Sequence, residues 1–249
     1  MNHYNIETLA TENSLCKYTF EEIKEYITIQ QTISLDSIIY LSEESLENLK
    51  NSSLKLTIKR LTAANGIFTL KIIFLASKGN YILRYWDDTN EICIDEGVKG
   101  IYKIDCANNS SVYIGKNTTS NGVHIICIES NVEIGEDCMF SDGILLQSTD
   151  QHGVVDIKKK EIINMHKRFI QIQNHVWLAR NSTIMPDVTI GEGSIVSLGA
   201  VVVKDVPKAS IAAGVPAQIV KREMTWSRFR KNFDNYSRML IDSEGEADG

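Results

Sequence analysis

Between residues 172 and 207 the large hydrophobic residues recur at every sixth position without a break. A second set, four positions later in each hexad, is small or β-branched. An α-helix would place apolar residues three or four apart and an ordinary strand would place them two apart, so neither fits. The large residues are Ile172, Leu178, Ile184, Ile190, Val196 and Val202, and the smaller ones are Val176, Ser182, Val188, Ser194, Ala200 and Val206.

This period predicts a three-sided parallel β-helix in place of a generic β-sandwich. Three hexads would form one turn, and each aliphatic side chain would stack on its equivalent about 4.8 Å away in the next turn. The smaller residue of each hexad would occupy a corner, where there is less room. We therefore expect a mainly β protein built as a solenoid.

A second block has the same period but is out of phase with the first. Ile114, with Gly115 and Thr118, marks an earlier turn whose register slips by two. Leu146 and Ile172 are 26 positions apart, which is not a multiple of six. An insertion at 147–171 would explain this, and solenoid insertions project as loops, often on the binding face. The block comprises Ile128, Ile134, Phe140 and Leu146, with Val132, Cys138 and Ile144 four positions after the first three.

The segments before and after the repeats have a different character. Helical periodicity runs through 18–26, and Ser42 followed by two glutamates resembles a helix start. Residues 67–75 and 80–86 read as two strands around a turn, and 224–241 carries aromatic residues at helical spacing. The expected domains are an N-terminal α/β cap region at 1–90, a β-helix at 91–222 with a protruding loop at 147–171, and a C-terminal helix and acidic tail at 223–249.

Composition excludes several classes of protein. The 249 residues carry a net charge of -6, which argues against binding nucleic acid through phosphate contacts. No apolar run approaches the length of a membrane span, and Met1–Leu15 lacks the apolar stretch of a signal peptide. The five cysteines form no CxxC pair, so a zinc knuckle or redox dithiol is not expected. We expect a cytoplasmic protein with reduced thiols.

Three stretches of the chain, at 134–152, 174–206 and 212–221, resemble the hexapeptide-repeat acyltransferases. Within that family the chain is most similar to bacterial O-acetyltransferases that modify sugars, including capsule, sialic-acid and lipopolysaccharide types. The resemblance covers roughly 91–222. It implies a left-handed parallel β-helix, a homotrimer, and acetyl-CoA bound in a groove between neighbouring β-helices. It implies no metal, and a general base on the protruding loop.

His152 matches the family's loop histidine, in the stretch Ser-Thr-Asp-Gln-His. A sugar hydroxyl is a poor nucleophile, and an imidazole that titrates near neutral pH can remove its proton as it attacks a thioester. Asp150 or Asp156 could orient this imidazole, or could cap the loop instead.

Trp177 matches a tryptophan that the family places on a coil. The resemblance makes it one wall of the acetyl-CoA groove, with its N–H near the thioester oxygen. A packed surface aromatic is the alternative. Ala179 stands where the family usually has glycine, and Arg180 stands where related enzymes have a small polar residue that touches the donor.

The remaining donor-site residues also follow from the resemblance. Lys204 follows Val203, so the hydroxyl of the family's Thr-Lys pair is lost. Lys221 lies where a basic residue would meet the CoA phosphates, although solvated lysines would look the same in sequence. Ala179, Ser197 and Leu198 are candidates for backbone contacts along the pantetheine arm, and Leu198 replaces the usual alanine.

Two features bear on the acceptor. Asn121 matches an acceptor-binding asparagine of some sugar acetyltransferases. The loop carries Lys158, Lys159 and Lys160, followed by Lys167 and Arg168. This positive patch is either a solvated face or an attraction for a polyanionic glycan or for CoA itself, and Lys160 is our candidate acceptor contact.

The leading hypothesis is an acetyl-CoA-dependent O-acetyltransferase acting on a sugar or polysaccharide. The nearest alternative is an N-acetyltransferase that acts on an amino-sugar and has the same donor site. A metal-dependent carbonic anhydrase would need three converging imidazoles, for which His124, His152 and His175 are available. A non-catalytic scaffold would bind no CoA.

Overall fold

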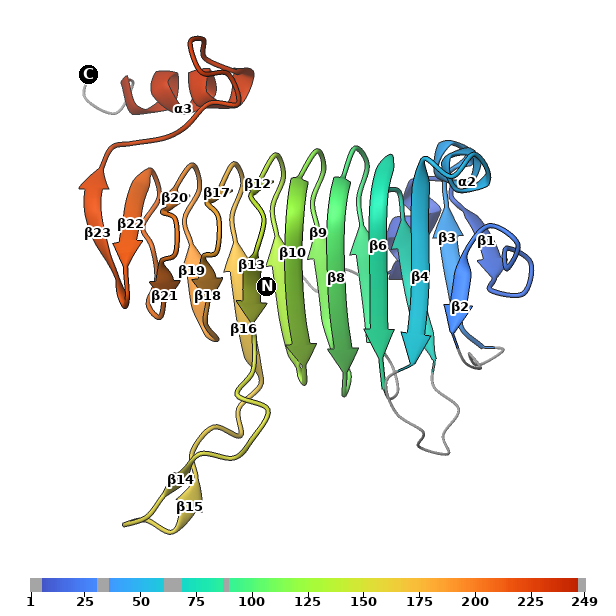
Figure 1. The fold of residues 1–249 in the computed structure, drawn as a ribbon, viewed down its shortest axis with the longest axis horizontal. Helices are drawn as coiled ribbons and strands as arrows, with labels where there is room; N and C mark the ends of the chain where they lie inside the picture. Colours follow the sequence, from blue (N-terminus) through green and yellow to red (C-terminus); the bar gives the residue numbers. More distant parts are fainter. Residues whose placement is uncertain (1–5, 31–35, 61–68, 87–89, 246–249) are drawn as a thin grey trace.

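The computed structural model describes residues 6–30, 36–60, 69–86 and 90–245. Its strands stack into two long sheets, of eight and thirteen strands among these residues (Figure 1). Up to β11 and β12 the neighbours in each of these two sheets are alternate strands of the chain, and beyond them every third or fifth strand pairs until β22. The pairings from β2 to β22 in these sheets are parallel. The chain therefore coils around a single axis, which confirms the predicted parallel β-helix.

The described residues form three helices and twenty-three strands. In chain order they are α1 (Ile6–Glu12), β1 (Cys16–Thr19), β2 (Thr28–Gln30), β3 (Ile38–Leu41), α2 (Glu43–Lys50), β4 (Leu54–Arg60), β5 (Leu70–Phe74), β6 (Lys78–Tyr85), β7 (Asn90–Ile94), β8 (Lys99–Ala107), β9 (Ser111–Ile114), β10 (Thr119–Ile128), β11 (Ser130–Ile134), β12 (Met139–Phe140), β13 (Ile144–Gln147), β14 (Val155–Asp156), β15 (Glu161–Ile162), β16 (Arg168–Ile172), β17 (Trp177–Leu178), β18 (Thr183–Ile184), β19 (Val188–Ile190), β20 (Ile195–Val196), β21 (Val201–Val202), β22 (Ser210–Gly214), β23 (Ala217–Arg222) and α3 (Asn235–Gly245).

The length of one coil falls along the chain. Ile94 pairs with Ile114, and Ile114 with Ile134, so these coils repeat every 20 positions. Ile172 pairs with Ile190, so the later coil repeats every 18 positions. The change explains the slip of two between the predicted turn at Ile114 and the later hexads.

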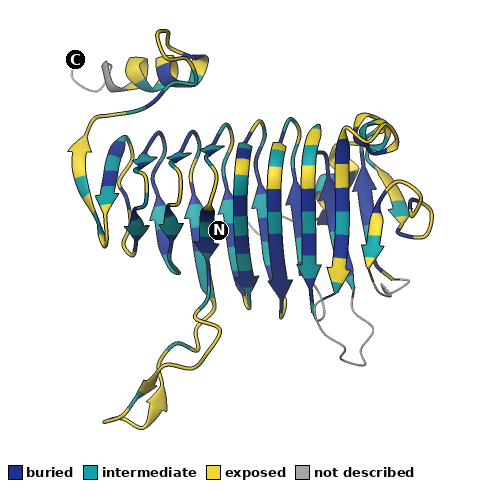
Figure 2. Cartoon of the chain, viewed as in Figure 1, coloured by how far each residue is buried: buried dark blue, intermediate teal, exposed yellow. Residues whose placement is uncertain are grey.

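The predicted hexads point into the core. All twelve large and small hexad positions between 172 and 206 are buried. In Figure 2 buried residues recur along every coil of the solenoid, whereas exposed residues dominate the β14–β15 hairpin and β23. The six-residue period therefore reports the spacing of the three corners, as the sequence predicted.

The insertion in the repeat is a protruding hairpin. Leu146 pairs with Ile184, 38 positions away, whereas 18 positions separate Ile184 from its next partner, Val202. The chain leaves the coil after Gln147 and returns at Arg168, and β14 and β15 form an antiparallel pair at the far end (Figure 1). This confirms the loop that the break in period predicted.

The β-helix starts earlier than residue 91. Strands β3, β5 and β7 lie in one sheet and β4, β6 and β8 lie in the other, so the strands on both sides of residue 90 belong to the same two sheets. The segments at 67–75 and 80–86 do not pair with each other, because β5 and β6 belong to different sheets. Residues 67 and 68 lie outside the described residues. Paired residues in this part are 29 positions apart between β2 and β4, 33 between β3 and β5, and 25 between β4 and β6. Such unequal coils carry no six-residue period, which is why this part resembles a separate cap in sequence.

Of the three predicted helices, one is confirmed, one is wrong and one is shorter. α2 begins after Ser42, whose hydroxyl accepts the N–H of Ser45 at 3.1 Å. The segment 18–26 is not a helix: it contains the end of β1 and a series of turns. Its apolar residues at 20 and 23, with that at 27, instead join the hydrophobic core of the coils. The C-terminal helix starts at Asn235, and 224–234 is irregular. No helix in the described part of the chain is long and apolar enough to cross a membrane.

Candidate active site

His152 lies on the protruding loop and is exposed to solvent. Its backbone carbonyl accepts a hydrogen bond of 2.9 Å from the amide of Asn164, which ties the two arms of the loop together. Among the described residues, no hydrogen bond or ion pair engages its imidazole. Both ring nitrogens are therefore open to a bound acceptor.

The two loop carboxylates that could have oriented His152 have other partners. Asp150 accepts hydrogen bonds from Asn164 at 2.9 Å and from Arg168 at 2.7 Å. These two bonds lower the pKa of Asp150. Asp156 accepts the N–H groups of the two lysines at 158 and 159, at 2.9 and 3.0 Å, and so caps the turn of the hairpin.

Arg168 anchors the base of the loop. Besides its bond to Asp150, its Nε lies 2.7 Å from Asp187 Oδ2 in the next coil. His166 Nε2 lies 2.9 Å from the same oxygen. Of the predicted loop cations, Arg168 is thus structural, while Lys160 stands exposed at the tip of the hairpin with φ of 57°.

Trp177 lies on β17, between Met139 and Ile195 of the neighbouring coils. Its side chain is half-buried and packs against Trp226, with ring centroids 6.2 Å apart. The indole N–H is buried and has no hydrogen-bond partner within the described residues. Leaving a buried donor unpaired costs about 1–3 kcal/mol, so this N–H is suited to a partner that arrives with a ligand or a second chain.

Ala179, Arg180, Ser197 and Leu198 share one corner of two neighbouring coils. The N–H of Ala179 donates to Val196 at 2.9 Å, and the N–H of Ser197 donates to the next coil at 2.8 Å. These two N–H groups are therefore occupied, which leaves carbonyl lone pairs and the Ser197 hydroxyl for any donor contact. Arg180 is exposed and donates from Nε to Asp142 at 2.7 Å, and Leu198 is 69% exposed.

Of the other predicted donor and acceptor residues, Asn121 lies at this same corner two coils earlier, and the two lysines lie elsewhere. Lys204 and Lys221 are exposed, and neither has a carboxylate within ion-pair distance among the described residues. Asn121 is exposed in β10, at the bulge between Ser120 and Val123. The structure thus places Asn121 on the same corner as these four residues, and places Lys204 and Lys221 outside it.

His152 and Trp177 lie on different sides of the solenoid. In one coil, β12, β13 and β16 form the three sides; Trp177 pairs with β12, whereas the loop leaves between β13 and β16. No hydrogen bond, ion pair or ring contact joins the two residues in the described structure. One copy of the chain therefore does not bring the two predicted catalytic groups together.

One buried cluster beside Trp177 left no sign in the sequence. His175 is fully buried and stacks between the rings of Trp226 and Tyr236, with centroids 4.2 and 4.6 Å away. Its Nδ1 lies 2.7 Å from Asp137 Oδ2 and its Nε2 lies 3.0 Å from the carbonyl of Trp226. Each ring nitrogen thus lies beside one protein oxygen, which fixes the orientation of the ring.

Arg228 completes this cluster. It donates to Asp137 Oδ1 at 2.8 Å and to the carbonyl of Cys138 at 3.1 Å. The N–H of the Trp226 indole donates to the carbonyl of His175 at 2.7 Å. The cluster docks 224–234 on the coil that carries Trp177 and fixes the ring that packs against it. The hexad pattern could not reveal it, because these bonds join positions that are far apart in the chain.

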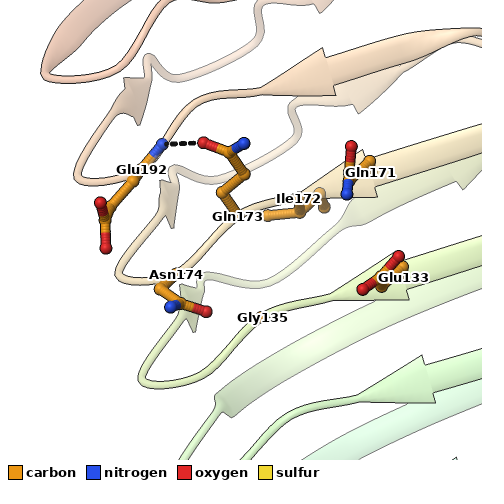
Figure 3. A pocket seen from close by; sticks show the side chains of 7 residues that line it. All are labelled: Glu133, Gly135, Gln171, Ile172, Gln173, Asn174 and Glu192. Atoms are coloured by element: carbon orange, nitrogen blue, oxygen red, sulfur yellow. Dashed lines mark hydrogen bonds between the residues drawn. The ribbon is translucent and has the colours of Figure 1, made fainter. Parts of the chain in front are cut away.

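A hollow of about 330 Å³ lies elsewhere, on the side of the eight-stranded sheet (Figure 3). None of the predicted site residues lines it, and the side chains around it are mostly acids and amides. It offers no cation for the phosphates of a CoA donor. Its lining residues are Glu133, Gly135, Gln171, Ile172, Gln173, Asn174 and Glu192.

The described part of the chain contains no group of three or more His, Cys, Asp or Glu residues arranged to hold a metal ion. The three histidines considered for such a site have separate surroundings. His124 contacts Asp105, His175 is enclosed in the aromatic cluster, and His152 is on the loop.

Comparison with known proteins places the chain in a family. No protein-family model matches it. The crystal structure of NeuO, a polySia-specific acetyltransferase, matches with a TM-score of 0.66 and 30% identity, over 78% of this chain and 88% of that one. The chain belongs to the hexapeptide-repeat acetyltransferases. Its fold is accordingly the left-handed parallel β-helix.

Other members of the family agree at lower coverage. A polysialic acid O-acetyltransferase of Escherichia coli O1:K1 is 39% identical over 129 residues, which is 51% of this chain and 42% of that protein. The galactoside O-acetyltransferase of Escherichia coli K12 is 31% identical over 112 residues, 45% of this chain and 54% of that protein. The chain thus spans about half the length of these curated relatives. The polysialic acid O-acetyltransferase OatWY shares the fold, with a TM-score of 0.63 and 23% identity over 88% of this chain and 95% of that one.

Proposed function

We propose that the chain transfers an acetyl group from acetyl-CoA to a hydroxyl of an acidic, capsule-type polysaccharide. The observation that carries the proposal is that the chain presents two groups without hydrogen-bond partners among the described residues. They are the exposed imidazole of His152 and the buried indole N–H of Trp177. The first is suited to accept a proton and the second to donate a hydrogen bond to an oxyanion. Membership of an acetyltransferase family supplies the reaction in which both are needed.

His152 acts as the general base. It accepts the proton of the sugar hydroxyl while that oxygen bonds to the thioester carbonyl carbon. Trp177 donates its N–H to the carbonyl oxygen as negative charge develops there. The C–S bond then breaks, the acetyl ester remains on the sugar, and the thiolate of CoA takes the proton that His152 had accepted. Lys204 and Lys221 hold the donor phosphates, and Ser197, Ala179, Leu198 and Arg180 line its arm.

Association of two copies of the chain would bring His152 of one copy close to Trp177 of the other. The separation of His152 and Trp177 on different sides of one solenoid supports a site that is completed by a second copy. We therefore propose a homotrimer with the donor between neighbouring solenoids, acting in the cytoplasm. Asn121 and Lys160 contact the acceptor in this arrangement.

The test replaces His152 and a matched loop histidine in turn. His152→Ala is expected to lower kcat by about 10²–10⁴-fold, the usual contribution of a general base. His166→Ala, an exposed histidine on the same loop, should stay within about threefold of wild type. Thiol release from acetyl-CoA with an acidic glycan acceptor measures both. Near-wild-type turnover in His152→Ala, or an equal loss in both variants, would contradict the assignment.

The same assay separates hydroxyl from amino acceptors. An amine that is already deprotonated needs less help from a base, so His152→Ala would lose little activity on an amino-sugar. Faster transfer to an amino-sugar than to any hydroxyl acceptor would favour an N-acetyltransferase over the function proposed here.

A further inference from the structure

One face of the first coils is strongly basic. The strands β4, β6, β8 and β10 lie side by side in the thirteen-stranded sheet (Figure 1). Their outward positions carry six full cations and one carboxylate, Asp105, a formal charge of +5 on a protein whose net charge is -6. Lys78 and Lys99 lie just before the corner at Gly79 and Gly100, and the other four cations lie after it. The cations are Lys55, Lys59, Lys78, Arg84, Lys99 and Lys103, and we call the surface that spans this corner the basic face.

The other sheet provides the contrast. The strands that cross the same coils there, β5, β7, β9 and β11, carry one lysine and two glutamates. The lysine, Lys71, is paired with Glu7. Positive charge is therefore concentrated on the thirteen-stranded sheet, and the basic face is more positive than the rest of the chain.

Like charges lie directly opposite each other on the basic face. Lys78 pairs in register with Lys99, and Lys59 pairs with Arg84. Such pairs across a sheet destabilise it. None of the five lysines has a carboxylate within ion-pair distance among the described residues. A bound polyanion would relieve this repulsion, since its charges could lie between the strands.

Asp105 does not neutralise the surface but shapes its centre. Arg84 donates from Nε to Asp105 Oδ1 at 2.6 Å and pairs through its second nitrogen with Oδ2. His124 Nε2 lies 2.9 Å from Oδ2. The carboxylate is almost fully covered by these two side chains, which remain partly exposed above it. It holds them as fixed donors that face solvent.

The chemistry of the face favours a glycan over other polyanions. Its aromatic residues, Tyr81, Tyr85 and Tyr102, are buried inside the coil. No aromatic side chain of these four strands is therefore available for the base stacking that single-stranded nucleic acids use. Between the lysines lie Asn80 and the half-exposed Ile101, which provide an amide and a flat apolar surface for sugar rings.

The face leads towards the proposed catalytic loop. β10 pairs with β13 on the side away from β8, and Ile126 of β10 lies opposite Gln147. The loop that carries His152 begins directly after Gln147. A polymer lying across the four strands would therefore run towards the point where the loop leaves the solenoid.

We propose that the basic face binds an extended polyanionic glycan, whose carboxylates meet the lysines of successive strands. This inference rests on the proposed function, in that the bound glycan is the acceptor. It adds a binding surface remote from the donor site, and it assigns the acceptor to the class of long acidic polymers.

The test compares two triple variants with the same change in charge. Lys59→Gln/Lys78→Gln/Lys103→Gln removes half of the six cations from the basic face. Lys17→Gln/Lys24→Gln/Lys231→Gln removes three exposed lysines elsewhere. Binding of fluorescently labelled polysialic acid of defined length is measured by titration at several salt concentrations. We expect about tenfold weaker binding and a shallower salt dependence for the first variant, and wild-type behaviour for the second.

Separate probes identify the ligand class. A neutral dextran of equal length should bind at least about tenfold more weakly than the polysialic acid, and an oligonucleotide of equal charge or anionic vesicles should bind no more tightly. Unchanged binding by the face variant, an equal loss in the control variant, or preference for dextran, oligonucleotide or vesicle would overturn the proposal.

Measurements of acetyl transfer distinguish a failure of the binding surface from a failure of the proposed enzymatic function. The face variant should raise KM for the long acceptor about tenfold and leave kcat on a monomeric sialic acid unchanged. If neither the wild type nor the face variant transfers acetyl groups, but the face variant still binds the glycan more weakly, the binding surface is supported and the proposed enzymatic function is wrong. If transfer occurs and KM is unchanged, the surface fails and the function stands.

Discussion

The two halves of the solenoid have one topology but different interiors. The coils from β6 to β10 repeat every 20 or 21 positions, and the coils before them are longer, with paired residues 25 to 33 positions apart. The strands β4, β6, β8 and β10 are also long. The later coils have many two-residue strands and repeat every 18 positions. Tyr81 and Tyr102 stack in the first half with centroids 5.0 Å apart, and Phe74 meets Tyr81 edge-on at 5.0 Å. In the later half aliphatic and small residues fill most of the interior, together with the buried ring of Phe140.

The difference shows what a slightly longer repeat does to a coil. The extra residues widen its cross-section, and large aromatic side chains then fill an interior that isoleucine and valine fill in the narrow coils. The corner between two sides also changes. In β10 it is a bend inside one continuous strand, whose two ends pair with β12 and β13 separately. In the next coil the same corner is an open turn at 141–143.

The largest effect should come from glycines at this corner. Gly100, in the wide coils, has φ of +127°, and a Cβ there would lie 1.8 Å from the carbonyl oxygen of Ser120. Gly199, in the narrow coils, has φ of +67°, and a Cβ there would meet no atom within 4 Å. Gly100→Ala should therefore cost more than about 4 kcal/mol, and Gly199→Ala about 1–2 kcal/mol for the left-handed backbone alone.

Urea unfolding followed by circular dichroism measures both glycine variants. Equal losses of stability would mean that the bend at Gly100 relaxes to admit a methyl group. The distinction between a closely stacked corner and an open one would then be wrong.

A smaller effect tests how the two interiors are filled. Tyr81→Ala removes a ring that contacts both Phe74 and Tyr102, and it should destabilise the fold by about 3–5 kcal/mol. Ile184→Val removes one methylene from a narrow coil and should cost about 0.5–1.5 kcal/mol. A thermal or urea midpoint for each variant gives the comparison. If Tyr81→Ala costs no more than Ile184→Val, the aromatic stack is not what fills the wide coils.

The sequence pattern predicts the coils of the narrow half of the molecule but not those of the wide half. Each hexad aliphatic from Ile172 to Val202 is buried as expected, because a repeat of 18 positions places the three corners six positions apart. Coils of 25 to 33 positions between β2 and β6, followed by coils of 20 or 21 positions, leave no fixed period, so the sequence pattern separates β2–β6 from the later coils. The hairpin was predictable for the same reason as the hexads, since an insertion breaks a strict period.

Parts of the candidate site could also be predicted from the sequence, and other parts could not. His152 and Trp177 could be named from their resemblance to a family, but their separation on two sides of one coil could not. The cluster of His175, Trp226 and Arg228 depends on contacts between positions that are 38 to 111 apart in the chain. The basic face needs the register of four strands before Lys78 and Lys99 become neighbours. Long-range pairing of this kind leaves no local pattern in a single sequence.

Two carboxylates, one buried in the wide coils and one exposed in the narrow coils, differ in what holds their charge. Burial alone would raise the pKa of Asp105, but hydrogen bonds from His124 and Arg84 outweigh it and lower that pKa below its ordinary value of 3.8. A hydrogen bond from Arg180 also lowers the pKa of Asp142, which is exposed. A carboxylate whose pKa is lowered in the folded state stabilises the fold fully above about pH 4, and this stabilisation is lost as pH falls through the lowered value.

The smallest effect should distinguish these two carboxylates. Asp105→Asn should destabilise the protein by about 1–3 kcal/mol at pH 7, and the difference from wild type should shrink as the pH falls below about 4. Asp142→Asn should leave stability unchanged at pH 7, because solvent screens an exposed pair. Urea unfolding of the three proteins between pH 7 and pH 3 gives the curves. A difference for Asp105→Asn that persists unchanged at pH 3 would show that the amide disrupts packing, and that the charge of Asp105 does not hold Arg84 and His124 in place.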